Sequence, residues 1–569
     1  MALPPRLRPM YRRARALTQT ILGPSSPTSP LPLPQASCSV SVTAGRRSHS
    51  TKLDGLSSRF VFPSGLYPFL VIWLTIVILL IRQQYYLPSS PSMISCTASP
   101  WDDWPPDTCG VNGTDCVEDL TGIDGKEFRC MGGCKETTLG NPRWIGDEKV
   151  DRVPLIVGGG DGQRTYRADS WVCASAIHSS LISPTLGGCV TFHALPYRFG
   201  FSDFVSSDSH GLQSTAFQPF YPGAFRLSSL PSTGCLDIHY IMTGFNAFCL
   251  SITTVLLRPP QPLLFTILLV MGYFQIVLFS DAPSYPPNWE QIFARLVPVL
   301  VTGYWAWKIS FRTTMQGFKD LALEQAFWQG AGYWIGIESS TIFARLPISR
   351  LGYDALDPAG VTALTIIVVI VVIIALVQAW EMRKLGFLRY YLIRYLPLVP
   401  ILIILAFIPG YTLRVHHYLL ALIAIPVLSL PNRISLFFQA FMLGLFLDGV
   451  GRWGWAGIIE QTASLLGDAN AGTLVPIFFA NTTSSDLLQF SPIADIDKVY
   501  NVSSYSMLID DIQYFSNYPN DTLDLSSLYL AEGVNHYFRL AYIANGSSLD
   551  FSDPVTRWSN GSWGDYGFG

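Results

Sequence analysis

The sequence predicts an α-helical multi-pass membrane bundle of about nine spans that carries an extracytoplasmic α/β domain and a C-terminal β-rich domain. Three observations lead to this fold class. The 569-residue chain is 49% hydrophobic and only 14% charged, whereas soluble domains have about 25% charged residues. Long uncharged stretches recur along it. Eight of its ten cysteines lie between Cys96 and Cys235. A net charge of −3 does not favour a nucleic-acid partner.

The N-terminal segment, residues 1–59, is basic and rich in Ser and Pro, with Asp54 as its one acidic residue. This composition predicts a disordered segment. Its arginines also resemble a mitochondrial presequence, an alternative that the clustered cysteines and glycosylation motifs oppose. Residues 60–81 are uncharged and long enough to cross a bilayer. Because basic flanks stay in the cytosol, we expect a signal anchor with a cytosolic N-terminus.

The membrane domain is expected to occupy residues 239–448. A weak span at 326–343 is interrupted by Glu338 and three glycines. With it the chain has nine spans and an extracytoplasmic C-terminus, and without it eight spans and a cytosolic C-terminus. A re-entrant hairpin at 326–343 would also give eight. The remaining predicted spans are 239–257, 263–280, 292–309, 360–380, 395–413, 415–430 and 434–448.

Two patterns favour nine spans. The C-terminal tail, residues 464–569, contains a cluster of Asn-x-Ser/Thr glycosylation motifs, which are used only outside the cytosol. Nine spans also place a basic loop with Arg383 and Lys384 in the cytosol, as the positive-inside tendency requires. We therefore expect a membrane of the secretory pathway. The candidate glycosylation sites are Asn481, Asn501, Asn520, Asn545 and Asn560 in the tail and Asn112 beside the cysteines.

The tail has no cysteine and no long apolar run. Short alternating stretches such as 537–543 are separated by turn residues, which predicts a small antiparallel β domain. Its likeness to a fibronectin-type sandwich rests on this pattern alone.

The cysteine-rich region, residues 95–236, contains a segment from Tyr166 to His178 that predicts a buried helix. Asp169 and Ser170 are residue types that cap helix N-termini. An apolar stripe at helical spacing follows them. An even number of clustered cysteines predicts disulfides formed in an oxidising compartment. A zinc site that begins at Cys130-x3-Cys134 is the alternative, but no matching second pair of ligands follows. The stripe consists of Cys173, Ala174 and Ile177.

This segment and its flanks resemble the LCCL domain, a module of extracellular proteins, over about residues 116–230. Ser175, Ser180 and His210 depart from the family pattern. The whole chain is similar to the multi-pass LCCL proteins of fungi, a resemblance that implies no reaction. The motif residues are Cys130, Cys134, Tyr166, Asp169, Ser170, Cys173, Ala174, Ala176, His178, Gly188, Gly211 and Ser214.

The resemblance implies a central helix wrapped by short strands and held by two disulfides. It pairs Cys134 with Cys173, and Cys130 with either Cys116 or Cys109. A further bridge between Cys189 and Cys235 is our own hypothesis, because the family does not require a cysteine at Cys189.

His178 invites a catalytic interpretation as a base beside Ser170 or Ser175, since residues three apart on a helix are neighbours. No orienting acid stands at a fixed spacing, and the family is not enzymatic. We favour a buried histidine hydrogen-bonded to a backbone carbonyl, with Tyr166 and Asp169 also structural.

In the membrane region, nine spans bring His416, His417 and Asp448 near one extracytoplasmic face, where they are candidate ligands for zinc or members of a proton relay. The competing interpretation is interfacial anchoring with an Asp448–Arg452 pair, and we favour it because adjacent histidines on a helix face apart. Glu338 is a further candidate, since ionisable groups within membranes are costly.

The sequence favours a binding or sensing role over catalysis and implies no cofactor. The expected partners are the lipid bilayer and an extracytoplasmic ligand of lipid, polysaccharide or matrix type. A transporter or channel is the second hypothesis, and an intramembrane metal-dependent hydrolase is the third.

Overall fold

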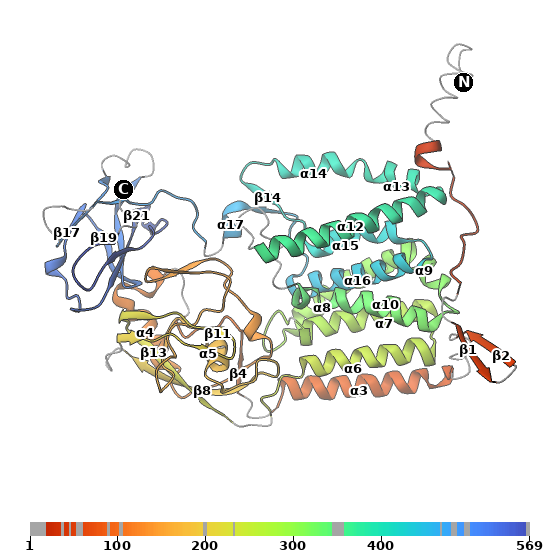
Figure 1. Ribbon diagram of the computed structural model, residues 1–569, viewed down its shortest axis with the longest axis horizontal. Coiled ribbons are helices and arrows are strands. Elements are labelled where there is room, and N and C mark those ends of the chain that lie inside the picture. Colours follow the sequence, from red (N-terminus) through yellow and green to blue (C-terminus); the bar gives the residue numbers. More distant parts are fainter. Residues whose placement is uncertain are drawn as a thin grey trace, which may run out of the picture. The chain divides into compact units, whose positions relative to one another are not determined.

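The computed structural model divides the chain into two compact units (Figure 1). The helical unit comprises Met1–Tyr85 and Ile238–Thr462, and the β-rich unit comprises Tyr86–Asp237 and Ala463–Gly569. The cysteine-rich region and the C-terminal tail, expected as separate domains, therefore belong to one unit. The structure describes residues 19–24, 26–35, 39–44, 47–52, 61–87, 91–101, 106–196, 202–230, 234–280, 282–343, 358–466, 469–479, 486–493 and 501–564.

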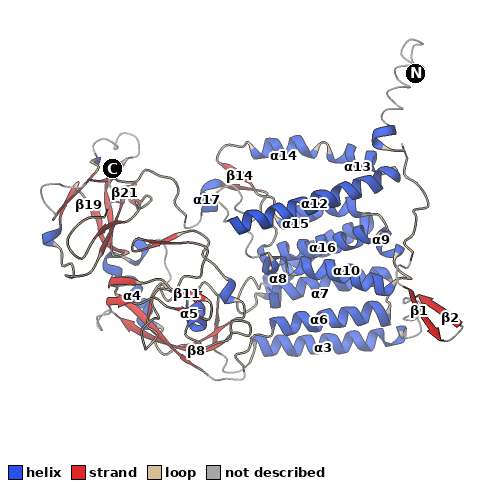
Figure 2. Ribbon diagram, in the orientation of Figure 1, coloured by secondary structure: helices blue, strands red, loops and turns tan. Residues whose placement is uncertain are grey.

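Helices laid side by side form the core of the helical unit (Figure 2). Turns of π-helix extend three of them, at Thr253–Leu257, Ile276–Ser280 and Trp307–Phe311. The helices are α3 (Leu66–Tyr85), α6 (His239–Ile252), α7 (Gln261–Gln275), α8 (Trp289–Ala306), α9 (Arg312–Gly317), α10 (Ala322–Ile337), α11 (Ser339–Ile342), α12 (Pro358–Lys384), α13 (Leu388–Tyr395), α14 (Leu398–Ala406), α15 (His417–Ala424) and α16 (Arg433–Trp453).

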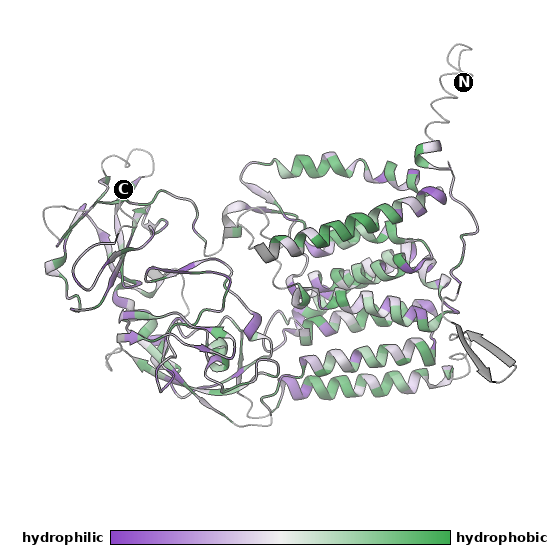
Figure 3. Cartoon of the chain, viewed as in Figure 1, coloured by the Kyte–Doolittle hydropathy of each residue, from purple (hydrophilic) through white to green (hydrophobic). Residues whose placement is uncertain are grey.

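Among the described residues, six helical segments are long and apolar enough to cross a membrane, and the hydropathy colouring shows α12 and α14 as strongly apolar (Figure 3). The expected spans at 292–309 and 326–343 are helical but fall outside this set, and that at 415–430 is a shorter apolar helix, His417–Leu428. The six segments are Pro63–Tyr85, His239–Leu257, Gln261–Ser280, Leu364–Lys384, Leu388–Ala406 and Arg433–Trp453.

The structure differs from the sequence prediction at the end of one expected span and within the N-terminal segment. The expected span 395–413 ends at Ala406 in the structure, and its last residues form strand β14 (Tyr411–Leu413), which pairs with β15 (Ile459–Gln461). Gly410 allows this turn because its φ is +76°, a conformation that glycine adopts without strain. In the segment expected to be disordered, β1 (Ser39–Ala44) and β2 (Arg47–Lys52) form a hairpin, in keeping with their β-branched residues.

Two of the three glycines of the weak span are packing residues. A Cβ atom on Gly332 would lie 2.1 Å from the Phe437 carbonyl oxygen, and one on Gly336 would lie 2.2 Å from the Phe441 carbonyl oxygen. Small residues four apart allow two helix backbones to approach closely. The contacts pair Gly332 with Phe437 and Gly336 with Phe441, so the residue numbers of both partners rise in the same direction. Helix α10 therefore runs parallel to α16. The segment is helical up to Ile337, and Glu338 separates this helix from the short helix α11.

The N-terminal part of the β-rich unit is a five-stranded sheet around a short buried helix, α5 (Val172–His178). All seven residues of α5 are buried, which confirms the predicted central helix. The strand order is β3 (Ser92–Ile94), β4 (Glu127–Cys130), β8 (Gly188–Pro196), β13 (Gly223–Ser229) and β7 (Tyr166–Arg167). Two-stranded sheets beside it pair β5 (Arg143–Ile145) with β6 (Glu148–Val150), β9 (Ser202–Phe204) with β12 (Phe217–Phe220), and β10 (Asp208–Ser209) with β11 (Leu212–Gln213).

Four disulfides hold this region, and their pairing corrects the expected one. Cys173 on α5 bonds to Cys130 and not to Cys134, because Cys130 is the last residue of β4 in the sheet that packs beside α5. Cys134 lies in the following 3₁₀ turn and bonds to Cys96. The remaining bridges join Cys109 to Cys116, which are therefore not partners of Cys130, and Cys189 to Cys235, as hypothesised.

The C-terminal part of the β-rich unit consists of two antiparallel sheets, which confirms a β-rich fold. Phe490 of the smaller sheet meets Tyr505 of the larger one at a ring distance of 4.8 Å, within a common apolar core. The smaller sheet is β16 (Phe478–Phe479), β17 (Leu487–Phe490) and β20 (Thr522–Asp524); the larger is β19 (Ile512–Tyr518), β18 (Val502–Ile509), β21 (His536–Ala544), β22 (Ser547–Ser548) and β23 (Val555–Arg557).

Candidate functional site

His178 is a buried structural residue at the end of α5. Its Nε2 faces the Ser207 carbonyl oxygen at 3.1 Å, so Nε2 carries the hydrogen, since a carbonyl only accepts. Its Nδ1 then accepts from the Tyr166 hydroxyl at 2.8 Å. Burial lowers the pKa of His178. With both ring nitrogens engaged, the arrangement matches the interpretation of a buried histidine bonded to a backbone carbonyl.

The two serines proposed as partners of His178 have other surroundings. The Ser170 hydroxyl accepts from the Val157 backbone N–H at 2.9 Å. The Ser175 hydroxyl is buried and has no hydrogen-bond partner among the described residues. The family alanine at this position would leave no such unsatisfied group.

Asp169 and Ser170 do not cap a helix, contrary to the sequence prediction. α5 begins two residues later, at Val172, and its N-cap Trp171 makes no side-chain capping bond. The Asp169 carboxylate instead accepts two hydrogen bonds from Arg167, at 2.9 and 2.7 Å. A buried guanidinium holds a carboxylate more strongly than a backbone amide does, because both groups are charged and the contact is bidentate.

Two of the three departures from the family motif, Ser180 and His210, fall at left-handed backbone positions. Ser180 has a φ of +66°, which explains the family glycine there. His210 and Gly211, with φ of +55° and +68°, form the two-residue turn between β10 and β11. Such turns need positive φ at both residues and therefore favour Asn-Gly. The motif thus encodes backbone geometry and core packing.

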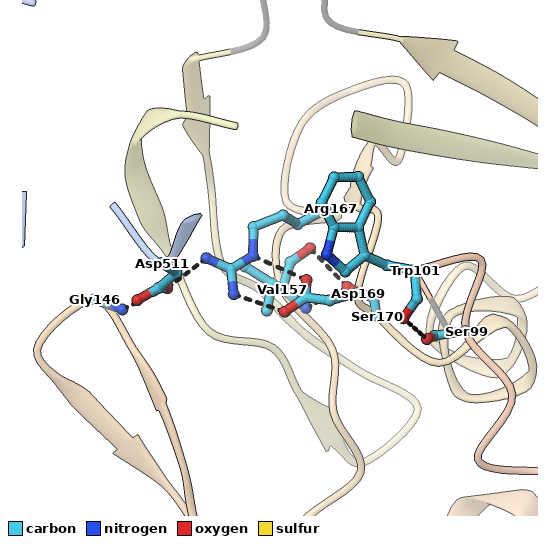
Figure 4. Close-up of polar contacts among 8 residues, drawn as sticks. All are labelled: Ser99, Trp101, Gly146, Val157, Arg167, Asp169, Ser170 and Asp511. Atoms are coloured by element: carbon cyan, nitrogen blue, oxygen red, sulfur yellow. Dashed lines mark hydrogen bonds and ion pairs between the residues drawn. The ribbon is translucent and has the colours of Figure 1, made fainter. Parts of the chain in front are cut away.

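The buried ion cluster centred on Arg167 joins the two parts of the β-rich unit (Figure 4). The Arg167 side chain is 1% exposed and bonds Asp169 through one edge and Asp511, from the turn after β18, through Nη1 at 2.7 Å. Its guanidinium also lies over the rings of Phe217 and Tyr221, 4.3 and 4.5 Å from their centroids. The pKa of Arg167 is raised because its two carboxylates outweigh the cost of burial.

Asp511 makes a second contact across the same junction. Its Oδ2 accepts from the Gly146 backbone N–H at 2.9 Å, and a Cβ on Gly146 would meet the Tyr537 ring at 2.7 Å. Segments more than 300 residues apart in the sequence therefore share one buried polar centre.

In the helical unit, the structure separates one of the three proposed metal ligands, His416, from the other two. His417 Nδ1 lies 3.5 Å from Asp448 Oδ2, whereas His416 Nε2 donates to the Gly457 carbonyl oxygen at 2.8 Å and lies 3.5 Å from Glu460. No group of three or more His, Cys, Asp or Glu side chains among the described residues is arranged to hold a metal ion.

Asp448 is a fully buried carboxylate on α16. Its Oδ2 accepts from the hydroxyls of Ser339 and Ser340 at 3.0 and 2.7 Å. Its Oδ1 has no hydrogen-bond partner among the described residues. Arg452, the expected ion-pair partner, has its guanidinium over the Trp453 ring.

Glu338 ends a chain of polar side chains through the helices. Its Oε1 accepts from Thr243 at 3.1 Å and from Ser280 at 2.9 Å, and its Oε2 lies 3.8 Å from His239 Nε2. The chain continues from Thr243 to Gln275, then Asn246 and Trp73. Glu338 directly precedes Ser339 and Ser340, the hydroxyl partners of Asp448.

The glycosylation motifs that the structure describes lie on the surface of the β-rich unit. Their five asparagines are exposed. Asn501 and Asn545 lie together, with the Asn501 amide donating to Asn545 at 2.8 Å. The other exposed asparagines are Asn112, Asn520 and Asn560, and Asn481 lies outside the described residues.

Comparison with known proteins identifies an LCCL domain in this chain, because the family profile of that name matches residues 111–221. The chain is also similar to the Saccharomyces cerevisiae protein YIL067C, described as uncharacterized. The two are 27% identical over 569 aligned positions, which cover 88% of this chain and 80% of the yeast protein. No solved structure matches the chain.

Sequence reasoning missed Asp511, Tyr221 and the amides Asn246 and Gln275. Each is one polar residue in an ordinary surrounding sequence, and its role depends on a partner far along the chain. Asp510-Asp511 between two apolar strands signals a turn, but nothing in the sequence connects it to Arg167.

Proposed function

We propose that this chain is an integral membrane protein that crosses the bilayer nine times, with residues 1–59 in the cytosol and the β-rich unit outside it. The parallel packing of α10 and α16 supports this topology. Three passes lie between these two helices, so α16 crosses the bilayer in the same direction as α10. The pairing of β14 with β15 supports it as well, since α14 and α16 then end on the same side.

The distribution of charge agrees with this orientation. The topology places Arg258, Lys319, Arg383, Lys384 and Arg433 together at the ends of helices on the cytosolic side. Lys and Arg are enriched in short cytosolic loops. The same topology puts the disulfides in an oxidising compartment, where such bonds persist, and puts all six asparagines where they can be glycosylated.

The function we propose is the binding or sensing of an extracytoplasmic ligand by the LCCL-containing β-rich unit, in a membrane of the secretory pathway. The observation that carries this proposal is the LCCL match within a disulfide-bonded α/β fold. The ligand class that the family resemblance supports is a lipid, a polysaccharide or a matrix component. Because most of the motif residues are buried, the ligand must contact the loops around them.

Binding by the full-length protein tests this proposal. The purified, oxidised protein in lipid nanodiscs would be passed over immobilised β-glucan, chitin, heparin and anionic lipid vesicles. We expect saturable binding to one of these probes, and its loss in a double variant, Cys130→Ser with Cys173→Ser, which removes the bridge that anchors α5. Absence of binding to every probe by the oxidised protein contradicts the proposal.

Transport is a second candidate function, favoured by the polar site around Glu338. Glu338 is partly buried with His239 near it, and Asp448 is fully buried with His417 near it. A carboxylate with a neighbouring histidine is a suitable place for a proton or a small cation. The change Glu338→Gln keeps the hydrogen-bonding shape and removes the charge. In proteoliposomes it should abolish proton-coupled flux, whereas Glu381→Gln, at a partly exposed position near the end of α12, should not. Equal flux in both variants and the wild type would rule out a role for this site.

A further inference from the structure

A groove runs between α6 and α10 in the helical unit. Its larger part has a volume of about 430 Å³ and is mostly apolar, with lining residues that include Leu250, Leu268, Phe327 and Trp334. A second cavity of about 300 Å³ continues it, since the two share Thr254 and Gln325. The second cavity is polar and ends at Arg258, Lys319 and Asp320. The groove is thus apolar at one end and charged at the other.

The length of the groove matches one leaflet of a bilayer. Its walls run from Ala247 to Arg258 on one side and from Ala322 to Trp334 on the other. At a rise of 1.5 Å per residue these stretches are roughly 16–18 Å long. Half of the ~30 Å hydrocarbon core of a bilayer is about 15 Å. An occupant with its polar end at Arg258 would therefore reach the middle of the membrane.

An unsatisfied donor marks the interior of the groove. Gln329 is 3% exposed and lines the larger cavity. Its Oε1 accepts from Gln325 Nε2 at 3.0 Å, which assigns its other terminal atom as the amide nitrogen. That Nε2 has no hydrogen-bond partner among the described residues. A buried unpaired donor costs roughly 1–3 kcal/mol in general, so a ligand that offers an acceptor at this depth is favoured.

We propose that this groove binds one anionic glycerophospholipid of the cytosolic leaflet. One acyl chain lies against Leu268 and Trp334, an ester oxygen accepts from Gln329 Nε2, and the anionic head group faces Arg258 and Lys319. Asp320 leaves the mouth with a net charge of +1, from two cations and one acid. The inference rests on the proposed membrane topology, which puts this end of the helices on the cytosolic side, where anionic lipids are concentrated.

Two glycines provide a matched pair of variants. A Cβ atom added to Gly330, which lines the larger cavity, would meet nothing within 4 Å, and the same holds for Gly244 on α6. Gly244 is exposed and does not line either cavity. Gly330→Leu should therefore fill the groove without disturbing the helices, and Gly244→Leu adds the same bulk elsewhere.

Native mass spectrometry of the delipidated full-length protein tests the inference, with phosphatidylserine and phosphatidylcholine added separately. We expect the wild type and Gly244→Leu to retain one phosphatidylserine, at least about fivefold more than phosphatidylcholine, since one net cation near a lipid surface contributes about 1 kcal/mol. Gly330→Leu should lose this lipid, and Arg258→Gln with Lys319→Gln should lose the preference for it.

Three results would overturn the inference in different ways. Equal retention of phosphatidylserine by Gly330→Leu and the wild type removes the groove as the site. Equal retention of both lipids by the wild type would show that the site does not select an anionic head group. Release of the protein from its source membranes by alkaline carbonate would refute the proposed topology itself, whereas a protein that stays in the membrane and fails the lipid test refutes only the groove.

Discussion

Removing Asp511 should separate the two parts of the β-rich unit. The change Asp511→Ala deletes the acceptor of an Arg167 Nη1 bond and of the Gly146 N–H bond. Arg167 is then a fully buried cation with one partner, Asp169, in place of two. Breaking a buried ion pair from one side generally costs about 3–5 kcal/mol. Because Asp169 remains bidentate, we expect the lower end, about 3 kcal/mol.

The assay is thermal or chemical unfolding of the full-length protein, followed by a probe in the β-rich unit. For a unit of this size, about 3 kcal/mol corresponds to a fall in Tm of roughly 6–12 °C. A double-mutant cycle with Arg167→Met isolates the pair, since methionine keeps the apolar contacts with Phe217 and Tyr221. Glu532→Ala, at an exposed position, is the matched control.

The reasoning would be refuted by a small effect. If Asp511→Ala shifts the Tm no more than Glu532→Ala does, the Arg167–Asp511 contact does not hold the unit together. A coupling energy below about 0.5 kcal/mol in the cycle leads to the same conclusion, because that value is within the additivity expected of independent sites.

Three further predictions follow from individual contacts. Non-reducing peptide mapping should recover Cys130 linked to Cys173, and recovery of Cys173 linked to another cysteine would contradict the pairing. Cys130→Ser should destabilise the β-rich unit by about 4 kcal/mol, which is the entropic estimate for a loop of 43 residues. Gly336→Leu should lower the melting temperature of the helical unit strongly, since its Cβ would lie 2.2 Å from the Phe441 carbonyl oxygen; an unchanged melting temperature would show that α10 and α16 are not in contact. His178 has a pKa lowered by burial from its ordinary 6.5, so its contribution to stability is complete above about pH 6.5 and is lost as pH falls below that value through the lowered pKa. The hydrogen-exchange protection factors of the amides around α5, which correct for the slower intrinsic exchange in acid, should therefore fall on acidification. Equal protection factors at about pH 7.5 and about pH 5 would contradict this.

Much of the fold follows from local patterns in the sequence. The buried helix around Cys173, the β-rich tail and the apolar helices were all predicted, because hydrophobic periodicity and residue type determine them within short windows. The bridge between Cys189 and Cys235 was also predicted. The boundaries of α14 and of α5 were not, since tertiary contacts at Gly410 and Asp169 decide where these helices end or begin.

The candidate sites were less accessible to sequence reasoning. His178 was assigned correctly to the core, since a histidine on an apolar helix face has a simple structural role. The glycines of α10, by contrast, were taken as interruptions of a span. Two of them, Gly332 and Gly336, provide a close parallel contact with α16, so their role depends on a partner helix about a hundred residues later. The same holds for Asp448, whose hydroxyl partners Ser339 and Ser340 lie in another helix.

The central claim is that the two sequence segments of the β-rich unit lie on the same, extracytoplasmic side of a membrane. Its most direct test is a glycosidase shift on two single-motif proteins, one that retains only Asn112 and one that retains only Asn560, with the other motifs changed to Gln at the asparagine. We predict that each protein shifts once on an electrophoretic gel when deglycosylated. A protein that carries a glycan at Asn112 but none at Asn560, with a reporter after the C-terminus found in the cytosol, would contradict the account.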